Sequence, residues 1–223
     1  MNLPELVHEC MCLMCGRYPG EPVDAAFIFG RAVHDYERGY GDAGILELAA
    51  ELYEAGLARC IAIPGWEGSF TRDGVRVPTG WPGKSEWIRR LVSLGVLTES
   101  IKYGSDPGAV LRHTGHDSDE LVSLAKMHGW QTVVALMNPH QLLRAMLGLL
   151  GSFQRCGYRL RVTPLCPQSV SWTKLVYGSQ GAVELPRSRH IREEWNRVLT
   201  YQVQGDFPLP SLAELRAYLL EKI

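Results

Sequence analysis

The sequence predicts an α/β protein, a three-layer α/β/α sandwich in which helices cover both faces of a mostly parallel, Rossmann-like sheet of about five strands. Short apolar runs that end near glycine alternate along the chain with stretches of helical periodicity. The segments between successive apolar runs are long enough for the crossovers that parallel pairing needs. No linker rich in Pro, Gly or Ser divides the 223 residues, so we expect a single domain over residues 1–223.

Five segments are predicted to be strands because they are apolar or rich in β-branched residues and are bounded by turn residues. They cover residues 25–29, 60–64, 100–104, 131–137 and 159–165. Three of them, AAFIF, CIAIP and QTVVALM, carry no charge, as expected of parallel strands that are buried on both faces. We therefore expect these three runs to be neighbouring parallel strands.

Helices are predicted where apolar residues recur at helical spacing and a glycine or proline marks an end. They cover residues 4–15, 42–57, 83–94, 117–128, 140–153, 189–203 and 211–222. Three turn-rich segments, 66–82, 105–115 and 166–188, are predicted to be irregular. The last two helices form a C-terminal helical extension, about residues 189–223, to the strand–helix core.

Composition argues against several classes of partner. The 23 basic and 24 acidic residues give a formal net charge of −1, which favours neither nucleic acid nor an anionic membrane surface as a partner. No apolar stretch approaches the length that spans a bilayer. Glu5, His8 and Glu9 stand where a signal peptide has basic and then apolar residues. We therefore expect a cytoplasmic protein whose 6 cysteines are reduced.

One cluster near the N-terminus contains enough soft ligands for zinc. His8, Cys10, Cys12 and Cys15 form the pattern H-x-C-x-C-x-x-C. Residues 4–15 also have the pattern of a helix, on which positions 10 and 12 lie about 200° apart and cannot share a metal. We expect small cysteines on a packing face of this helix and no metal.

Ligands of open parallel sheets bind beyond the carboxyl ends of the strands. The candidate site therefore comprises the segments that follow the predicted strands: 30–42, 65–86, 104–117 and 138–144. Neither G-x-G-x-x-G nor G-x-x-x-x-G-K-[ST] is present. The residues predicted to bind the ligand are Gly30, Arg31, Gly65, Lys84, Ser85, Glu86, Thr114, His116, Asn138, His140 and Arg144.

Roles follow from the chemistry of these groups. Arg144 and Lys84 are predicted to hold an anionic group of the ligand, since guanidinium and ammonium groups pair with phosphate or carboxylate. Lys84 and Ser85 also stand at a predicted helix start, where free N–H groups suit an anion. Glu86 is predicted to contact a hydroxyl or amine, although an acidic residue in a first helical turn also suits the helix dipole without any function.

Three side chains are candidates for acid–base catalysis should the ligand be transformed: Glu86, His116 and Asp117. An alternative reading applies to the segment HDSDE. Asp117 or Ser118 suits a helix N-cap, with Glu120 completing a capping box. We assign Ser118, Asp119 and Glu120 mainly to capping.

The order and spacing of these segments resemble the SanA/YdcF-type (ElyC-like) family of bacterial Rossmann-like proteins. The resemblance is carried by the FIFG strand end, the helix ELAAELYEAGLA, the strand IAIPG, GKSEWIRRLVSLGV, the polar loop before DELVSLAKMHGW, and ALMNPHQLLRAM. The family-like core covers about residues 24–165. Membrane-anchored members carry N-terminal hydrophobic segments that this sequence lacks, so it resembles the soluble branch.

The resemblance implies a role in envelope integrity and peptidoglycan precursor metabolism. Alternatively, it implies binding of S-adenosylmethionine, as in a soluble member of the family. Glu86 matches the acidic residue of the family's G-x-x-E segment, and Arg144 the arginine of its H-x-x-R-A motif. Gln141 stands where that motif has histidine. Residues 116–120 keep the polarity of the family's T-x-E-N stretch but not its identity, and Ile45 replaces a frequent arginine. These departures weaken the case for a retained family chemistry.

Two functions are therefore expected. The first is a small-molecule binding protein whose ligand is anionic or nucleotide-like, S-adenosylmethionine included. The alternative is a hydrolase or transferase that acts on a phosphorylated or nucleotide-like substrate of cell-envelope precursor metabolism. The sequence lacks a nucleophile elbow, an HExxH motif and a P-loop lysine, which favours the first. Protein interaction through Trp66, Trp81 and Trp87 is less specific, because aromatic residues also fill cores.

Overall fold

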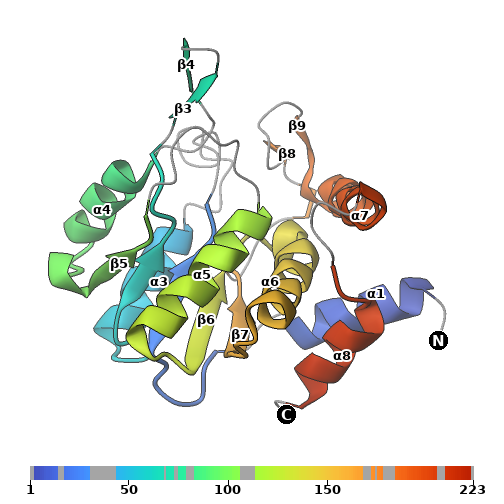
Figure 1. Ribbon diagram of the computed structural model, residues 1–223, viewed down its shortest axis with the longest axis horizontal. Helices are drawn as coiled ribbons and strands as arrows, with labels where there is room; N and C mark the ends of the chain where they lie inside the picture. The colour runs from blue at the N-terminus through green and yellow to red at the C-terminus, as the bar shows by residue number, and fades with distance from the viewer. Residues whose placement is uncertain are drawn as a thin grey trace.

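A central sheet of five parallel strands organises the molecule (Figure 1). In chain order the strands are β1 (Ala25–Ile28), β2 (Ile61–Ile63), β5 (Ile101–Tyr103), β6 (Thr132–Leu136) and β7 (Arg161–Leu165). The computed structural model describes residues 3–14, 18–30, 44–67, 69–72, 75–78, 83–105, 114–167, 172–173, 175–177, 184–204 and 209–221. The predicted fold class, an α/β protein built on a parallel sheet, is confirmed.

Strand order places a topological switch point in the middle of the sheet. The order is β5-β2-β1-β6-β7, so the chain builds outward from β1 in one direction and then returns to the other side. β1 pairs in parallel with both β2 and β6, which confirms the predicted neighbours. In sheets of this type the connections after the two central strands diverge, and a crevice opens beyond their carboxyl ends.

The sheet separates two apolar cores because successive residues of a strand face opposite sides. Phe27 belongs to one core, and its neighbours Ala26 and Ile28 belong to the other. Helices α5 (Thr114–His128) and α6 (Leu142–Cys156) cover the first core. Helices α3 (Gly44–Glu54) and α4 (Lys84–Ser93) cover the second. The result is the expected three-layer arrangement.

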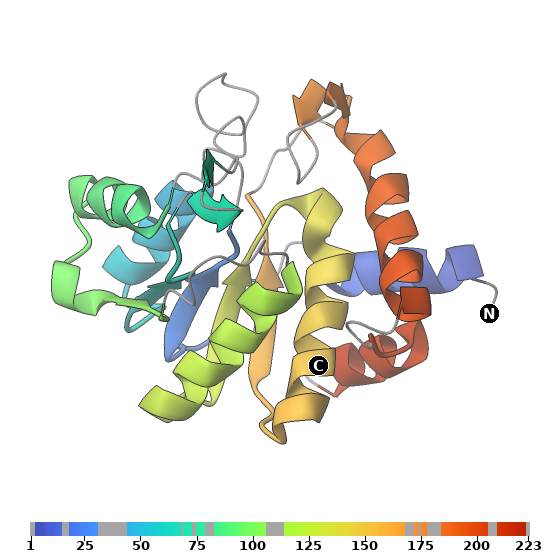
Figure 2. The same cartoon turned by 45° about the horizontal axis from the view of Figure 1, so that its top comes forward.

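The first core extends to helices from both ends of the chain. α1 (Leu3–Met14) packs on α8 (Leu212–Leu220), and α7 (Arg187–Gln204) runs along α6 (Figure 2). The Arg216 guanidinium contacts the Glu9 carboxylate across α8 and α1 at 2.8 Å. None of the described helices is both long and apolar enough to cross a membrane.

Asp24 ties the first strand to its neighbour at the amino edge of the sheet. Its carboxylate accepts hydrogen bonds from the Gln131 N–H at 2.8 Å, and from the Thr132 N–H and hydroxyl at 3.0 Å each. Burial alone would raise the pKa of Asp24, but these hydrogen bonds and the nearby Arg59 together hold it below its ordinary value. The start of β1 is thereby fixed against the start of β6.

The outer edge of β7 is occupied by a side chain of α8. The Tyr218 hydroxyl accepts a hydrogen bond from the Val162 N–H at 2.9 Å and donates one to the Leu160 carbonyl at 2.8 Å. Burial raises the pKa of Tyr218, so the hydroxyl remains a donor. Pro164, two residues beyond Val162, has no N–H to offer.

Two predictions of irregular structure are wrong. Segment 66–82 contains an antiparallel pair, β3 (Ser69–Arg72) and β4 (Val75–Pro78), and segment 166–188 contains a second, β8 (Leu175–Tyr177) and β9 (Glu184–Pro186). Each pair is short and stands apart from the main sheet, so neither needs a long apolar run. In addition, α5 begins at Thr114 rather than Asp117, and a 3₁₀ turn, η2 (Pro139–Gln141), precedes α6. A second 3₁₀ turn, η1 (Thr98–Ser100), precedes β5.

Candidate functional site

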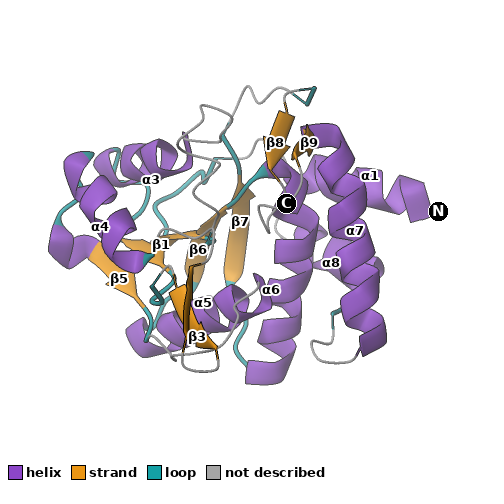
Figure 3. Ribbon diagram, turned by 90° about the horizontal axis from the view of Figure 1, so that it is seen from above, coloured by secondary structure: helices purple, strands orange, loops and turns teal. Residues whose placement is uncertain are grey.

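The carboxyl ends of the central strands lie side by side in the sheet, which Figure 3 shows from above. Gly30, Gly65, Gly104 and Asn138 lie just beyond β1, β2, β5 and β6. The β1–β6 register pairs Ile28 with Leu136. Gly30 and Asn138 each lie two residues further along, and they flank the switch point.

Two acidic side chains of α5 reach these strand ends. The Gly30 N–H donates to Asp117 Oδ2 at 3.2 Å, and the Gly65 N–H donates to Glu120 Oε1 at 2.7 Å. Asp117 and Glu120 are 5% and 8% exposed, so both hydrogen bonds lie within the protein. Residues three apart on a helix share a face, and this spacing lets one helix hold two adjacent strand ends. The start of α5 therefore fixes the backbone on which a ligand would rest.

The predicted capping box at this helix is wrong. The Ser118 hydroxyl donates to the Thr114 carbonyl one turn earlier at 2.9 Å, and the Glu120 carboxylate accepts a hydrogen bond from the Gly65 N–H. Asp119 accepts hydrogen bonds from the Ser152 hydroxyl at 2.6 Å and from Arg155 at 2.5 Å. The helix begins one turn before the predicted start, which moves all three residues out of capping positions.

Glycine is required at two of the strand ends. A Cβ on Gly65 would lie 1.9 Å from the Gly104 carbonyl oxygen, and a Cβ on Gly104 would lie 1.9 Å from Glu120 Oε1. Heavy atoms cannot approach this closely, so any larger residue would displace the backbone or the Glu120 side chain. The ends of β2 and β5 are therefore packed tightly around this carboxyl group.

Asn138 is the most unusual residue of the edge. It is 0% exposed, and neither its amide oxygen nor its amide nitrogen has a hydrogen-bond partner among the described residues. Its backbone is extended (φ −69°, ψ 146°) and leads into Pro139, where η2 begins. Buried polar groups are rarely left without partners, and an exception in a native structure calls for an explanation.

The start of α4, a predicted anion site, already contacts a carboxylate of this chain. Glu67 accepts a hydrogen bond from the Ser85 hydroxyl at 2.7 Å and lies 3.8 Å from the Lys84 ammonium. The Lys84 ammonium also lies 4.9 Å from the centre of the Tyr103 ring. The anionic group at this helix start is thus Glu67 of the same chain, and a contact of Lys84 or Ser85 with a ligand stays a prediction.

Glu86 is paired within its own helix. Its carboxylate accepts hydrogen bonds from Arg89 at 2.8 and 2.7 Å and from Arg90 at 2.7 Å. The hydrogen bonds from Arg89 and Arg90 lower its pKa to about 2. A carboxylate with so low a pKa is a weak proton acceptor near neutral pH, which argues against Glu86 as a general base.

Arg144, predicted to bind an anionic group, faces α7. Its guanidinium donates to the Glu194 carboxylate, which also accepts a hydrogen bond from Arg197 at 2.8 Å. Arg144 and Glu194 are 4% and 3% exposed. His140 lies nearby, with its ring 5.4 Å from that of His190 on α7. The Arg144–Glu194 contact therefore joins α6 to the C-terminal extension.

The predicted site residues thus fall into groups. Gly30, Gly65, Asn138 and Asp117 line the strand ends, whereas Lys84, Ser85 and Glu86 lie on α4 with the partners given above. His140 and Arg144 contact α7, and Thr114 and His116, both half-buried, begin α5. Arg31 lies outside the described residues. For these residues, contact with a ligand stays a prediction.

Sequence reasoning missed three residues that shape the site. The sequence pattern places Glu120 in a capping box, and it marks neither Glu67, which lies within a turn-rich segment, nor Gly104. Gly104 could have been found, because it follows its strand as closely as Gly30 and Gly65 follow theirs. The partners of the two glutamates depend on packing between segments far apart in the sequence.

The described residues of the N-terminal cysteine cluster lie on a helix, as predicted. α1 places Cys10 inside the first core, with its thiol 3.8 Å from the Leu212 carbonyl, and Cys12 at the surface, 3.6 Å from His8. Cys15 lies outside the described residues. Within the part of the chain that the structure describes, no group of three or more His, Cys, Asp or Glu side chains could hold a metal ion.

No protein-family model matches the chain, and no curated protein matches it in sequence. Among solved structures, the chain is similar to one described as a deacetylase triple mutant (Orf2*T) of the teicoplanin biosynthetic pathway. The identity is 15%, the TM-score is 0.33, and the match covers 89% of this chain and 90% of that one. A TM-score of this size does not establish a common fold.

Proposed function

We propose that the chain is a small-molecule binding protein of the SanA/YdcF type whose ligand is nucleoside-like. The ligand would bind at the carboxyl edge of the sheet, between the ends of β1 and β6. The observation that carries this proposal is Asn138, a fully buried amide at the switch point with no hydrogen-bond partner for either of its polar atoms among the described residues.

Burying a polar group without a partner costs about 1–3 kcal/mol. Such a cost is commonly retained where a side chain serves binding. An asparagine amide offers one acceptor and one donor side by side, which matches a group that presents a donor and an acceptor in the same plane. The edge of an adenine base is such a group, and asparagine binds it in this way in nucleic-acid recognition.

The charges around the edge favour one kind of ligand. Asp117 and Glu120, two buried acidic side chains, lie at the ends of β1 and β2. Ionised carboxylates repel phosphate and attract cations. S-adenosylmethionine joins an adenosine to a sulfonium and an ammonium group, so it suits this edge better than a phosphorylated nucleotide.

The test is equilibrium binding by calorimetry with S-adenosylmethionine, adenosine and ATP as probes. We expect S-adenosylmethionine and adenosine to bind and ATP to bind more weakly. Asn138→Leu should weaken the binding of S-adenosylmethionine and of adenosine by about tenfold or more, because two hydrogen bonds to the ligand are lost. The control is Asn196→Leu, which changes an exposed asparagine on α7 and should leave binding unaltered.

A second measurement separates binding from folding. Leucine has a shape similar to asparagine and removes two buried polar atoms, so Asn138→Leu should keep or raise the free energy of unfolding in urea. If Asn138 served only the fold, Asn138→Leu would instead lower the free energy of unfolding. Unchanged affinity in Asn138→Leu, or no binding of adenosine or S-adenosylmethionine, would contradict the proposal.

A further inference from the structure

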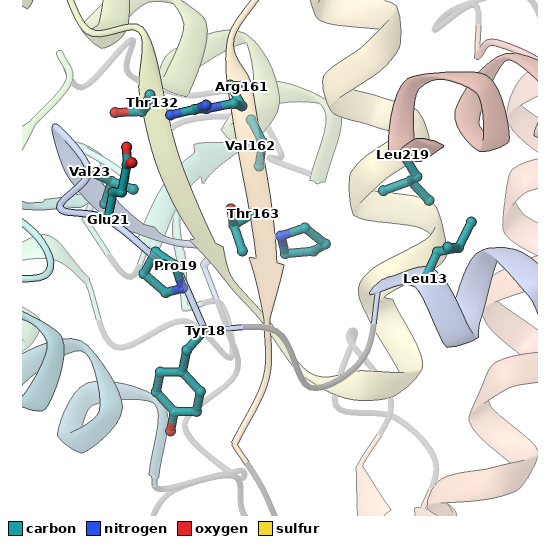
Figure 4. A pocket seen from close by; sticks show the side chains of 12 residues that line it. Leu13, Tyr18, Pro19, Glu21, Val23, Thr132, Arg161, Val162, Thr163 and Leu219 are labelled. Carbon is teal, nitrogen blue, oxygen red and sulfur yellow. The ribbon is translucent and has the colours of Figure 1, made fainter. Parts of the chain in front are cut away.

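A pocket of about 360 Å³ lies beside β7, away from the switch point (Figure 4). Its walls come from segment 18–23, from β7, and from the helices α1 and α8. Arg161 pairs with Thr132 at the start of the β6–β7 register, so this pocket opens near the amino ends of the strands. Pockets of this volume are at the lower end of the range that binds small molecules.

Two opposite charges face the pocket without neutralising each other. Figure 4 shows the Glu21 carboxylate and the Arg161 guanidinium on the same side of β7. Neither side chain forms an ion pair or a hydrogen bond in the described part of the chain, and the same holds for the Thr163 hydroxyl. The nearby Thr132 hydroxyl donates to Asp24. The groups that remain for a ligand are thus one cation, one anion and the hydroxyls of Thr163 and Tyr18.

The rest of the pocket is apolar. Leu13 of α1 and Leu219 of α8 lie on the other side of β7 in Figure 4, and Val162 and Pro164 of β7 also line the pocket. Leu13 is half-buried, so it offers an apolar surface to a ligand, whereas Leu219, Val162 and Pro164, which also line the pocket, are almost fully covered. The pocket is therefore charged at one end and apolar at the other.

We propose that this pocket binds a free α-amino acid with an apolar side chain. The Arg161 guanidinium would pair with the α-carboxylate, since its planar donors match the two carboxylate oxygens. The Glu21 carboxylate would accept hydrogen bonds from the α-ammonium group. A free amino acid carries both charges on neighbouring atoms, whereas an internal residue of a peptide carries neither. The apolar side chain would rest against Leu13 and Leu219.

The experiment is calorimetric titration of the full-length chain with L-leucine. Two analogues that each lack one charge, 4-methylpentanoate and 3-methylbutylamine, test the two ionic contacts separately. The variants are Arg161→Gln and Glu21→Gln, which remove one charge of the pocket at a time. Arg189→Gln and Glu51→Gln are matched controls, because both residues are exposed and neither lines the pocket.

We expect L-leucine to bind the natural chain, and each analogue to bind at least about tenfold more weakly. Arg161→Gln and Glu21→Gln should each weaken L-leucine binding to a similar degree, and the two controls should not. Absence of L-leucine binding, or equal affinity in all variants, would overturn the proposal. Asn138→Leu should leave L-leucine binding unchanged and Arg161→Gln should leave adenosine binding unchanged, so this proposal and the proposed function can fail independently.

Discussion

At the scale of single residues, Lys84, Glu86 and Arg144, three charges that the sequence offers for ligand binding, have partners within the chain. Glu86 shows this most clearly, because two arginines of its own helix bind it. Glu67 shows the same for the start of α4, where it contacts Lys84 and Ser85. Asn138 differs from them, since its two polar atoms have no partner among the described residues. This contrast is why the proposed function rests on an uncharged side chain.

The pairing of Glu86 predicts a specific pH dependence of stability. Its pKa is lowered from 4.5 to about 2 in the folded chain, so its contribution is fully present above about pH 4.5 and is lost as the pH falls through about 2. Glu86→Gln should therefore lower the free energy of unfolding near pH 7 by about 0.2–1 kcal/mol, the usual range for partly exposed pairs. The difference from the natural chain should shrink toward about pH 3.

Urea unfolding at a series of pH values measures this difference. Glu47→Gln is the control, because Glu47 is an exposed glutamate in the first turn of another helix, α3. Its substitution should give no comparable pH-dependent difference. A Glu86→Gln effect of equal size at about pH 3 and about pH 7 would contradict the role assigned to the ion pair.

At the scale of elements, α7 is held to the strand–helix core by a buried ion pair. Arg144 of α6 and Glu194 of α7 are both almost fully buried. Removing one partner of a buried pair leaves the other charge without full compensation, which costs about 3–5 kcal/mol. Arg144→Met should therefore destabilise the protein by several kcal/mol, at the lower end of that range because Arg197 also contacts Glu194.

The double variant Arg144→Met/Glu194→Leu should recover most of the lost stability, because it removes both charges and keeps the volume filled. Urea unfolding of the two single variants and the double variant gives the coupling energy of the pair. A stable Arg144→Met chain, or a double variant no more stable than the single ones, would show that the pair is unimportant for the fold. A binding assay on an Arg144 variant therefore needs this stability control.

At the scale of the whole molecule, the sheet could be predicted and the pairing of charges could not. Apolar runs such as 131–137 predict buried parallel strands because no other element buries both of its faces in so few residues. Hairpins such as β3–β4 need no core and leave only a weak pattern. The partners of Arg144 and Glu120 lie on other elements, and a charged side chain carries no local signal of the contact it will make. The sequence predicts that Asn138 lies at the site, but it does not predict that the side chain is buried, because burial depends on how the elements pack.

The first core joins the two ends of the chain, and one substitution tests this. Leu215 of α8 is 0% exposed, so Leu215→Ala should cost about 2–5 kcal/mol. It should also speed hydrogen exchange in α1, which packs on α8, more than in α3, which covers the other core. Leu220→Ala in the same helix is the control, because Leu220 is 37% exposed. Equal changes in α1 and α3 would contradict this division of the molecule.

The Tyr218 hydroxyl has a consequence for how the protein meets other chains. An unpaired sheet edge is a template on which a strand of another molecule can add, which is a route to aggregation. At β7 the outward-facing N–H of Val162 is bound by Tyr218, and the next outward position is Pro164. A foreign strand arriving there would find no free donor at either position. Growth of the sheet by strand addition is thus blocked along β7, which leaves β5 as the other edge strand of the sheet.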